Sequence, residues 1–475
     1  MSPALASWHC QDLAPVTGIS ASKNVVHTPQ TAAYFVYTHT RPLFRDAALT
    51  FLVMLTFVIA QTGLLDQRFA LRWLNENIAA FGGDVNRLAI WGQSAGGQSI
   101  CFHLASPGSA GLFTRAISSS GPCVLPYPSL AAAERDGLEW AHQAGCGGGD
   151  STLPHEPPAS IIACLRNASV AAVVSAGMPR KSPHDGFLYP AIDRTQLGWP
   201  NDNAELFRQG KISMVACMFG SADDDLGSSF ATGLVPKNVT AADYPKYLHA
   251  ISRAVGLDSA GAGNFVAQME ANYPLSRRGG DVKATLLDLI GDSNLACPQH
   301  TTATLVADAL ANATGAPVPN VAGTSSASYA YSFKYRAWQQ GGQAFHASDL
   351  PFFFGDSAEF DDADAAFNDA ELKVRDSMQL NLLHFVKYGR PSAVDWPPFG
   401  GSSSRDGGLH GGSGSSSGNG RDRAGGGQSV MEFGTTSTVV SDWKKARCDM
   451  WAKQREQTRW LGDSELQRIL RNVTV

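Results

Sequence analysis

Apolar residues recur at spacings of three and four after Asp66, and this pattern predicts a helix. The residues that carry the pattern are Phe69, Ala70, Trp73, Leu74 and Ile78. Gly82-Gly83 follow, where glycine commonly ends a helix. The next apolar run, Leu88 to Trp91, is as short as a buried strand.

A tight turn and further elements continue this alternation. Residues 92–97 are glycine-rich, 98–105 have a helical pattern, and 116–119 fit the next strand. The order helix–strand–turn–helix–strand is typical of a parallel sheet with crossover helices, so we predict an α/β fold. Further helices are expected at 130–146, 365–388 and near 443–461. Residues 430–433 follow a low-complexity stretch and resume the ordinary sequence pattern.

Three segments depart from this texture. Residues 401–428 are rich in Gly and Ser and predict a flexible surface insertion. Residues 1–60 form a divergent N-terminal segment, and 61–475 form the predicted main domain. The apolar run 47–60 is too short for a confident membrane span. It fits a buried strand or strand pair, and a displaced signal or anchor is the alternative.

Composition narrows the classes of function. Hydrophobic residues are 44% and charged residues 17%, which allows a sizeable core and excludes global disorder. The net charge of −5, with scattered Lys and Arg, gives no reason to expect nucleic acid as a partner. No Cys or His cluster has zinc-site spacing, so no metal is expected.

Gly92-Gln93-Ser94-Ala95-Gly96 matches the G-x-S-x-G pattern of a nucleophile elbow. A short strand precedes Ser94 and a helix follows it, as an elbow requires. Ser94 is therefore the candidate nucleophile, and the N–H of Ala95 the candidate oxyanion donor. The alternative is a glycine-rich structural turn, which the flanking elements disfavour.

The ungapped stretch 63–121, from GLLDQRFALRW to RAISSSG, resembles the type-B carboxylesterase/lipase family, which includes cholinesterase-like enzymes. The resemblance continues with gaps to about residue 451. It implies an α/β-hydrolase fold with a mostly parallel central sheet flanked by helices. It also implies hydrolysis of a small-molecule or lipid-like ester through an acyl-enzyme, with no cofactor.

A serine needs a general base, and the base needs an orienting carboxylate. In this fold their chain order is Ser, Asp or Glu, then His. His346 lies in GQAFHASDLPFFFG, which is similar to the family's histidine segment. Counting from Gly220 in ACMFGSADDDLG places Asp225 at the acid position, and Asp224 is the alternative.

The resemblance also implies two disulfides, Cys146–Cys164 and Cys297–Cys448; Cys10, Cys101, Cys123 and Cys217 stay unassigned. Four glycosylation sequons begin at Asn167, Asn238, Asn312 and Asn472. Together these features predict a secreted glycoprotein. Residues 1–30 contain no ordinary signal peptide. The alternative is a cytosolic protein with reduced thiols.

Members of the family carry a His-Gly-Gly segment upstream of the serine, and its N–H groups complete the oxyanion hole. Residues 1–60 contain no Gly-Gly, so the N-terminal strands and this segment are expected to be missing or replaced. The primary expectation is a serine carboxylesterase. The alternative is a catalytically impaired or non-catalytic homologue, either a truncated product or a binding protein.

Overall fold

The computed structural model describes residues 34–36, 52–54, 60–125, 127–146, 159–176, 190–192, 203–226, 235, 239–257, 259–313, 326–336, 343–356, 366–393, 396–400, 428–457 and 473. Within these residues, eight strands form one sheet in the order β1 to β8. Their bounds are β1 (Tyr34–Val36), β2 (Leu52–Met54), β3 (Ala89–Gln93), β4 (Arg115–Ser119), β5 (Ala216–Ala222), β6 (Ser328–Phe333), β7 (Val430–Phe433) and β8 (Thr438–Val440).

The sheet is parallel from β2 to β7, and only the outer pairs β1–β2 and β7–β8 are antiparallel. This confirms the predicted α/β fold with a mostly parallel sheet. Register pairs Gln93 with Ser119 and Ser119 with Gly220. The carboxyl ends of β3, β4 and β5 therefore meet at one edge, where ligands bind in open α/β sheets.

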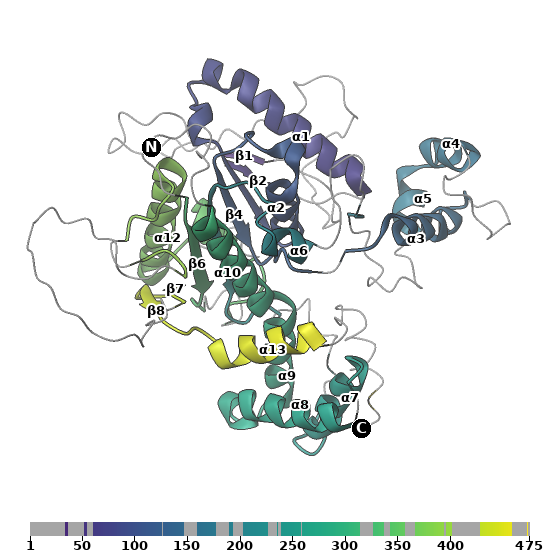
Figure 1. The fold of residues 1–475 in the computed structure, drawn as a ribbon, viewed down its shortest axis with the longest axis vertical. Helices are drawn as coiled ribbons and strands as arrows, with labels where there is room; N and C mark the ends of the chain where they lie inside the picture. The colour runs from purple at the N-terminus through teal and green to yellow at the C-terminus, as the bar shows by residue number, and fades with distance from the viewer. Residues whose placement is uncertain are drawn as a thin grey trace, which may run out of the picture.

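Helices flank the sheet on both faces (Figure 1). The longer ones are α1 (Ala60–Asn77), α2 (Ala95–Ala105), α3 (Leu130–Gln143), α4 (Ala159–Asn167), α7 (Tyr244–Ala254), α8 (Ser259–Asn272), α9 (Val282–Gly291), α10 (Cys297–Asn312), α12 (Asp369–Tyr388) and α13 (Lys445–Gln457). Shorter ones are α5 (Val170–Ser175), α6 (Asn203–Arg208) and α11 (Leu350–Phe354).

Alternate strand residues sort onto two cores, as the period of two in a strand requires. Ile90 and Phe219 pack in the core that α1, α2, α6 and α10 cover. Trp91 and Met218 pack in the opposite core, under α11 and α12. Because both faces are covered, β3 to β6 are buried along their whole length.

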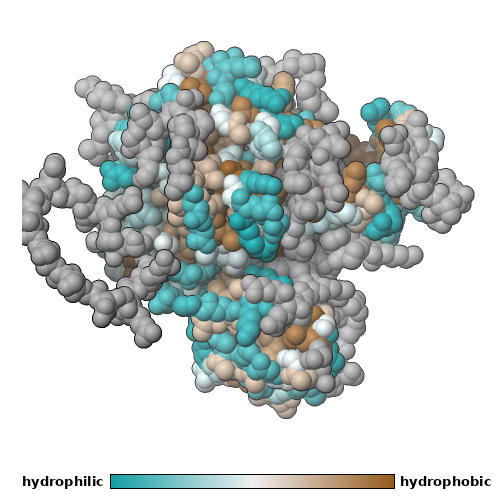
Figure 2. All heavy atoms as spheres, viewed as in Figure 1, coloured by the Kyte–Doolittle hydropathy of each residue, from teal (hydrophilic) through white to brown (hydrophobic). Residues whose placement is uncertain are grey.

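A third core lies beyond one end of the sheet. It joins α7, α8, α9 and α13, and Leu226 at the end of the segment after β5 belongs to it. Helices α3, α4 and α5 lie apart from the sheet in Figure 1. Figure 2 shows hydrophilic and hydrophobic side chains interspersed over the visible face of the molecule.

Element boundaries differ from the sequence-based ones mainly at helix starts. The helix expected from Asp66 begins at Ala60, and a 3₁₀ turn, Ile78–Phe81, extends it. Gly82 then adopts φ 79°, the left-handed conformation expected of a C-terminal glycine. The apolar run 47–60 contributes β2, and its remaining residues before Ala60 lie outside the described part.

The segment 1–33 and the predicted insertion, apart from Gln428, also lie outside the described residues. The division at residue 60 stays a prediction. Among the helices that the structure describes, none is long and apolar enough to cross a bilayer.

Candidate active site

The candidate nucleophile lies in the sharp turn between β3 and α2. Ser94 has φ 56° and ψ −120°, a conformation that residues with side chains rarely adopt. Its N–H donates to the carbonyl of Ser119 on the neighbouring strand at 2.8 Å, and its own carbonyl accepts from the N–H of Gln98 at 3.0 Å. These bonds hold the strained turn between a strand end and a helix start.

Three glycines allow the backbone to close around this turn. A Cβ on Gly92 would lie 2.1 Å from the carbonyl oxygen of Gly96, and one on Gly97 would lie 2.9 Å from the Cα of Gly121. A Cβ on Gly121 would lie 2.3 Å from the carbonyl oxygen of Ser94. No side chain fits at these distances, so packing of backbone on backbone explains the glycines of the elbow.

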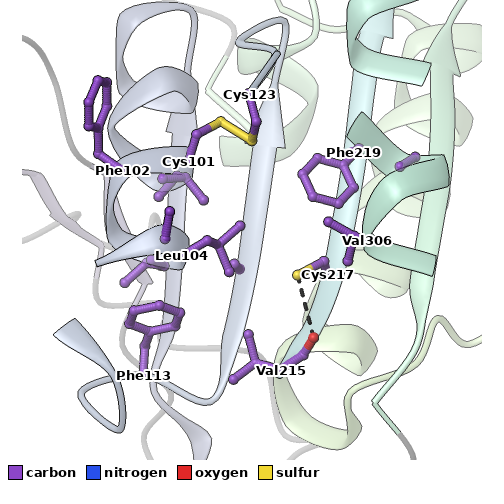
Figure 3. Close-up of a cluster of buried hydrophobic side chains, with 14 of the residues drawn as sticks. Cys101, Phe102, Leu104, Phe113, Cys123, Val215, Cys217, Phe219 and Val306 are labelled. Atoms are coloured by element: carbon purple, nitrogen blue, oxygen red, sulfur yellow. Dashed lines mark hydrogen bonds between the residues drawn. A yellow bond between two sulfur atoms is a disulfide. The ribbon is translucent and has the colours of Figure 1, made fainter. Parts of the chain in front are cut away.

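A disulfide ties the helix after the elbow to the segment after β4. Cys101 on α2 and Cys123 form it, with a Cα–Cα distance of 5.0 Å and both residues fully buried (Figure 3). The N–H of Cys123 also donates to the hydroxyl of Thr302 on α10 at 3.0 Å. Sequence reasoning left both cysteines unassigned, since only the folded sheet brings them together.

His346 and Asp225 are brought together from different strand ends. Asp225 lies after β5 and His346 after β6, and His346 Nδ1 is 2.8 Å from Asp225 Oδ1. The Asp225 side chain is 1% exposed and that of His346 is 21% exposed. A backbone bond of 2.9 Å from the N–H of Asp224 to the carbonyl of Ala344 joins the two segments.

The alternative acid, Asp224, points into ion pairs instead. Arg336 Nη2 lies 2.7 Å from Asp224 Oδ2, and Arg278 contacts Asp224 Oδ1. Asp223 faces the buried ammonium of Lys444 at 3.4 Å. Burial opposes ionisation of Asp223, but Lys444 and Arg336 outweigh it and hold its pKa below the usual value. The three consecutive carboxylates are thus sorted, and Asp225 is the one that reaches the histidine.

A buried polar chain runs beneath the site from β3 to the histidine segment. Trp91 Nε1 donates to Ser119 Oγ at 2.9 Å, Ser119 Oγ lies 2.6 Å from the Tyr331 hydroxyl, and that hydroxyl donates to Asp349 Oδ2 at 2.9 Å. Asp349 is fully buried, and burial raises its pKa to about 6. The chain ties β3, β4 and β6 to the start of α11, three residues after His346.

The elbow reaches His346 through the residue before the serine. The side-chain amide nitrogen of Gln93 lies 3.2 Å from His346 Nε2. Gln93 is the last residue of β3, and its side chain is nearly buried, with 9% of the residue exposed. Sequence reasoning treated this position as a variable one within the motif and did not anticipate the contact.

Ala95 occupies the place expected of an oxyanion donor. It is the first residue of α2, and the first N–H groups of a helix have no carbonyl partner within the helix. The helix N-terminus also favours negative charge. Its role in binding an oxyanion stays a prediction.

Another polar chain supports the first turn of α2. His103 is fully buried, with Nδ1 2.9 Å from Ser109 Oγ and Nε2 3.1 Å from Gln67 Oε1. Gln67 then donates to Ser99 Oγ at 3.3 Å, and Ser99 donates to the carbonyl of Ala95 at 3.2 Å. Burial, with a smaller effect from the charge of Arg68, lowers the pKa of His103 to about 3, so the ring is neutral.

The other residues that the sequence singled out are cysteines and sequon asparagines. Cys146–Cys164 and Cys297–Cys448 are disulfides in the structure. Cys217 is a buried free thiol whose pKa is raised by burial. Asn167 and Asn312 are exposed at the last residues of α4 and α10, whereas Asn238 and Asn472 lie outside the described residues.

The sequence matches a family of known proteins. Residues 44–410 match the carboxylesterase family. Acetylcholinesterase of Danio rerio is 28% identical over 321 residues, which cover 62% of this chain and 49% of that protein. The chain thus spans about half the length of this curated relative.

Solved structures agree in fold. A PNB esterase structure superposes with a TM-score of 0.56 at 21% identity, covering 82% of this chain and 67% of that one. A thermophilic PNB esterase gives 0.55 at 20% identity, covering 82% and 68%. With a family match over most of its length, the chain belongs to the carboxylesterase family.

Proposed function

We propose that the chain hydrolyses carboxylic esters, with Ser94 as nucleophile, His346 as general base and Asp225 as the carboxylate that orients it. The observation that carries the proposal is the 2.8 Å contact between His346 Nδ1 and Asp225 Oδ1, made at the sheet edge where the strained elbow presents Ser94. The order Ser, Asp, His along the chain is the order this fold uses.

The proposed reaction is acyl transfer to water. His346 takes the hydroxyl proton of Ser94 as its oxygen attacks the ester carbonyl carbon, and Asp225 stabilises the imidazolium. The N–H of Ala95 binds the oxyanion that forms. When the carbon–oxygen bond to the alcohol breaks, His346 returns the proton to the alcohol. Water, deprotonated by His346, then attacks the acyl-enzyme and regenerates Ser94.

The oxyanion hole sets the expected rate. The family's Gly-Gly donors have no counterpart in the sequence of residues 1–60. Loss of one such donor costs about 3–4 kcal/mol, or roughly 100–1000-fold in rate. The absence of Gly-Gly from residues 1–60 favours the second candidate, an impaired homologue. The substrates proposed for the esterase are small-molecule or lipid-like esters.

Labelling by a fluorophosphonate tests the proposal, because the probe needs an activated serine but no natural substrate. Wild type should label, Ser94→Ala should not, and Asp225→Asn should label far more slowly. Thermal unfolding checks that each variant is folded. A folded wild type without Ser94-dependent label would refute the esterase proposal and favour the impaired homologue.

We also propose passage through the secretory pathway. The three disulfides support it, because disulfides persist in oxidising compartments. The sequons at Asn167 and Asn312 are exposed and therefore accessible to glycosylation. After expression in a secreting eukaryotic cell, enzymatic deglycosylation should lower the apparent mass of the protein. The variant Asn167→Gln/Asn312→Gln should have a lower apparent mass than wild type before deglycosylation. Equal masses would contradict glycosylation at these two sites.

A further inference from the structure

The contacts of His346 with Asp225 and with Gln93 together determine which atom donates in each hydrogen bond. His346 Nδ1 faces the Asp225 carboxylate, which only accepts, so Nδ1 carries the hydrogen. In the neutral ring, Nε2 then presents its lone pair. The Gln93 atom at 3.2 Å is the amide nitrogen, which only donates. Gln93 therefore donates to the lone pair of His346 Nε2.

That lone pair is the one that the proposed mechanism assigns to the Ser94 proton. Nε2 of a neutral imidazole has one lone pair, in the plane of the ring, and it accepts one well-directed hydrogen bond. The amide of Gln93 and the hydroxyl of Ser94 come from adjacent residues and compete for it. The amide is held by a nearly buried side chain at the end of β3, so its position is defined by the sheet.

We propose that Gln93 is a positioning residue that occupies the Nε2 lone pair of His346 in the resting enzyme and must release it before Ser94 can be activated. This inference rests on the proposed function. Gln93 restrains the base toward the neutral ring and slows the activation of Ser94.

Gln93 and the carboxylates around His346 have opposite effects on protonation of its ring. Asp225 contacts the ring at 2.8 Å, and the buried Asp349, three residues along the chain, interacts with it electrostatically; as carboxylates both favour the imidazolium. Gln93 opposes them, because protonation turns Nε2 into a donor that faces the donor nitrogen of the amide. A hydrogen bond to the neutral form of a group disfavours its charged form.

The test compares Gln93→Met, Gln93→Glu and the control Gln379→Met. Gln379 also donates one side-chain hydrogen bond of 3.2 Å, to the carbonyl of Phe353, but makes no described contact to His346. The readout is the rate of fluorophosphonate labelling between pH 4 and 9. Gln93→Met should label about 2–12-fold faster on the plateau, as expected for loss of one competing hydrogen bond.

The acid limb of the same profile separates competition from simple packing. It should move up by roughly half to one pH unit in Gln93→Met. The acid limb should move up by about one pH unit or more in Gln93→Glu, where a carboxylate favours the imidazolium. The control should keep the profile of wild type. Slower labelling of Gln93→Met, or an unchanged acid limb, would overturn the inference.

Failure of the proposed function has a different signature. If wild type shows no Ser94-dependent label, the esterase proposal fails by itself. The contact is then tested without activity, by titrating the His346 ring proton by NMR in Ser94→Ala with and without Gln93→Met. A higher midpoint in the double variant supports the contact, and an unchanged midpoint overturns it.

Discussion

Replacing both Cys101 and Cys123 by alanine removes the disulfide behind the elbow, and Cys146→Ala/Cys164→Ala is its matched control. The two bridges close loops of similar length, with sequence separations of 22 and 18 residues. The chain-entropy relation then gives a loss of about 3.4 kcal/mol for the first bridge and about 3.2 kcal/mol for the second. By this term alone the two double variants should be equally destabilised.

Burial adds a difference between them. Cys101 and Cys123 are fully buried, whereas Cys164 is only partly buried. Deleting buried atoms leaves a cavity, which we expect to add about 1 kcal/mol to the loss in Cys101→Ala/Cys123→Ala. Urea unfolding at pH 7.5 measures both free energies of unfolding.

Activity should separate the two variants much more than stability does. Cys123 lies two residues after Gly121, whose backbone packs against Ser94 and Gly97. A displacement of a reacting group by about 1 Å can cost about 100-fold in rate. Labelling of Ser94 should therefore slow by at least about 10-fold in Cys101→Ala/Cys123→Ala and stay near wild type in the control.

Labelling must be compared at a temperature where both variants are folded. The reasoning is wrong if both variants label at the wild-type rate, or if both slow by the same factor. Either result would mean that the bridge stabilises the chain without placing the elbow.

Three further predictions follow from the site. Asp225→Asn should reduce the labelling rate by about 10⁴-fold, as loss of the orienting carboxylate does in serine hydrolases, while Asp224→Asn should mainly lower the melting temperature; equal labelling rates would show that the acid is misassigned. Gly97→Ala should destabilise by about 1–3 kcal/mol, because its Cβ would lie 2.7 Å from Ser118 Oγ and 2.9 Å from a backbone Cα; an unchanged urea midpoint would contradict this. The folded-state pKa of His103 is about 3, below the ordinary value of 6.5, so the unfolded chain binds the proton first on acidification. Its contribution to stability is complete above pH 6.5 and falls by about 1.4 kcal/mol per pH unit down to about pH 3. Urea unfolding at pH 6.5 and 5.5 should show a loss of about 1 kcal/mol in wild type and a smaller one in His103→Gln.

Local patterns sufficed to predict the elements around the elbow. The apolar run before Ser94 became β3, and the periodic stretch before it became α1. The helices between 244 and 312 gave no comparable signal. Helix α9 is buried on nearly every side, so its apolar residues show no single stripe. Helix α8 contains Gly261 and Gly263, which disfavour helix, and tertiary packing of Phe265 and Met269 compensates.

The candidate site was predictable only as far as neighbours in sequence determine it. Ser94 and His346 lie in distinctive segments, but the choice between Asp225 and Asp224 depends on Arg278 and Arg336, which are distant in the chain. The contact of Gln93 with His346 and the Cys101–Cys123 bridge could not be predicted for the same reason, because their partners are distant in the chain. Residues that only the folded sheet brings together produce no recognisable spacing along the sequence.

The left-handed backbone of Ser94 sets stability against the proposed activity at one residue. A non-glycine residue held in such a conformation costs about 1–3 kcal/mol, whereas glycine adopts it without strain. Ser94→Gly would therefore relieve the strain and remove the candidate nucleophile together, while Ser94→Ala would remove the hydroxyl and keep the strain. Strain at position 94 therefore predicts that Ser94→Gly unfolds at a higher urea concentration than Ser94→Ala, although both lack the hydroxyl.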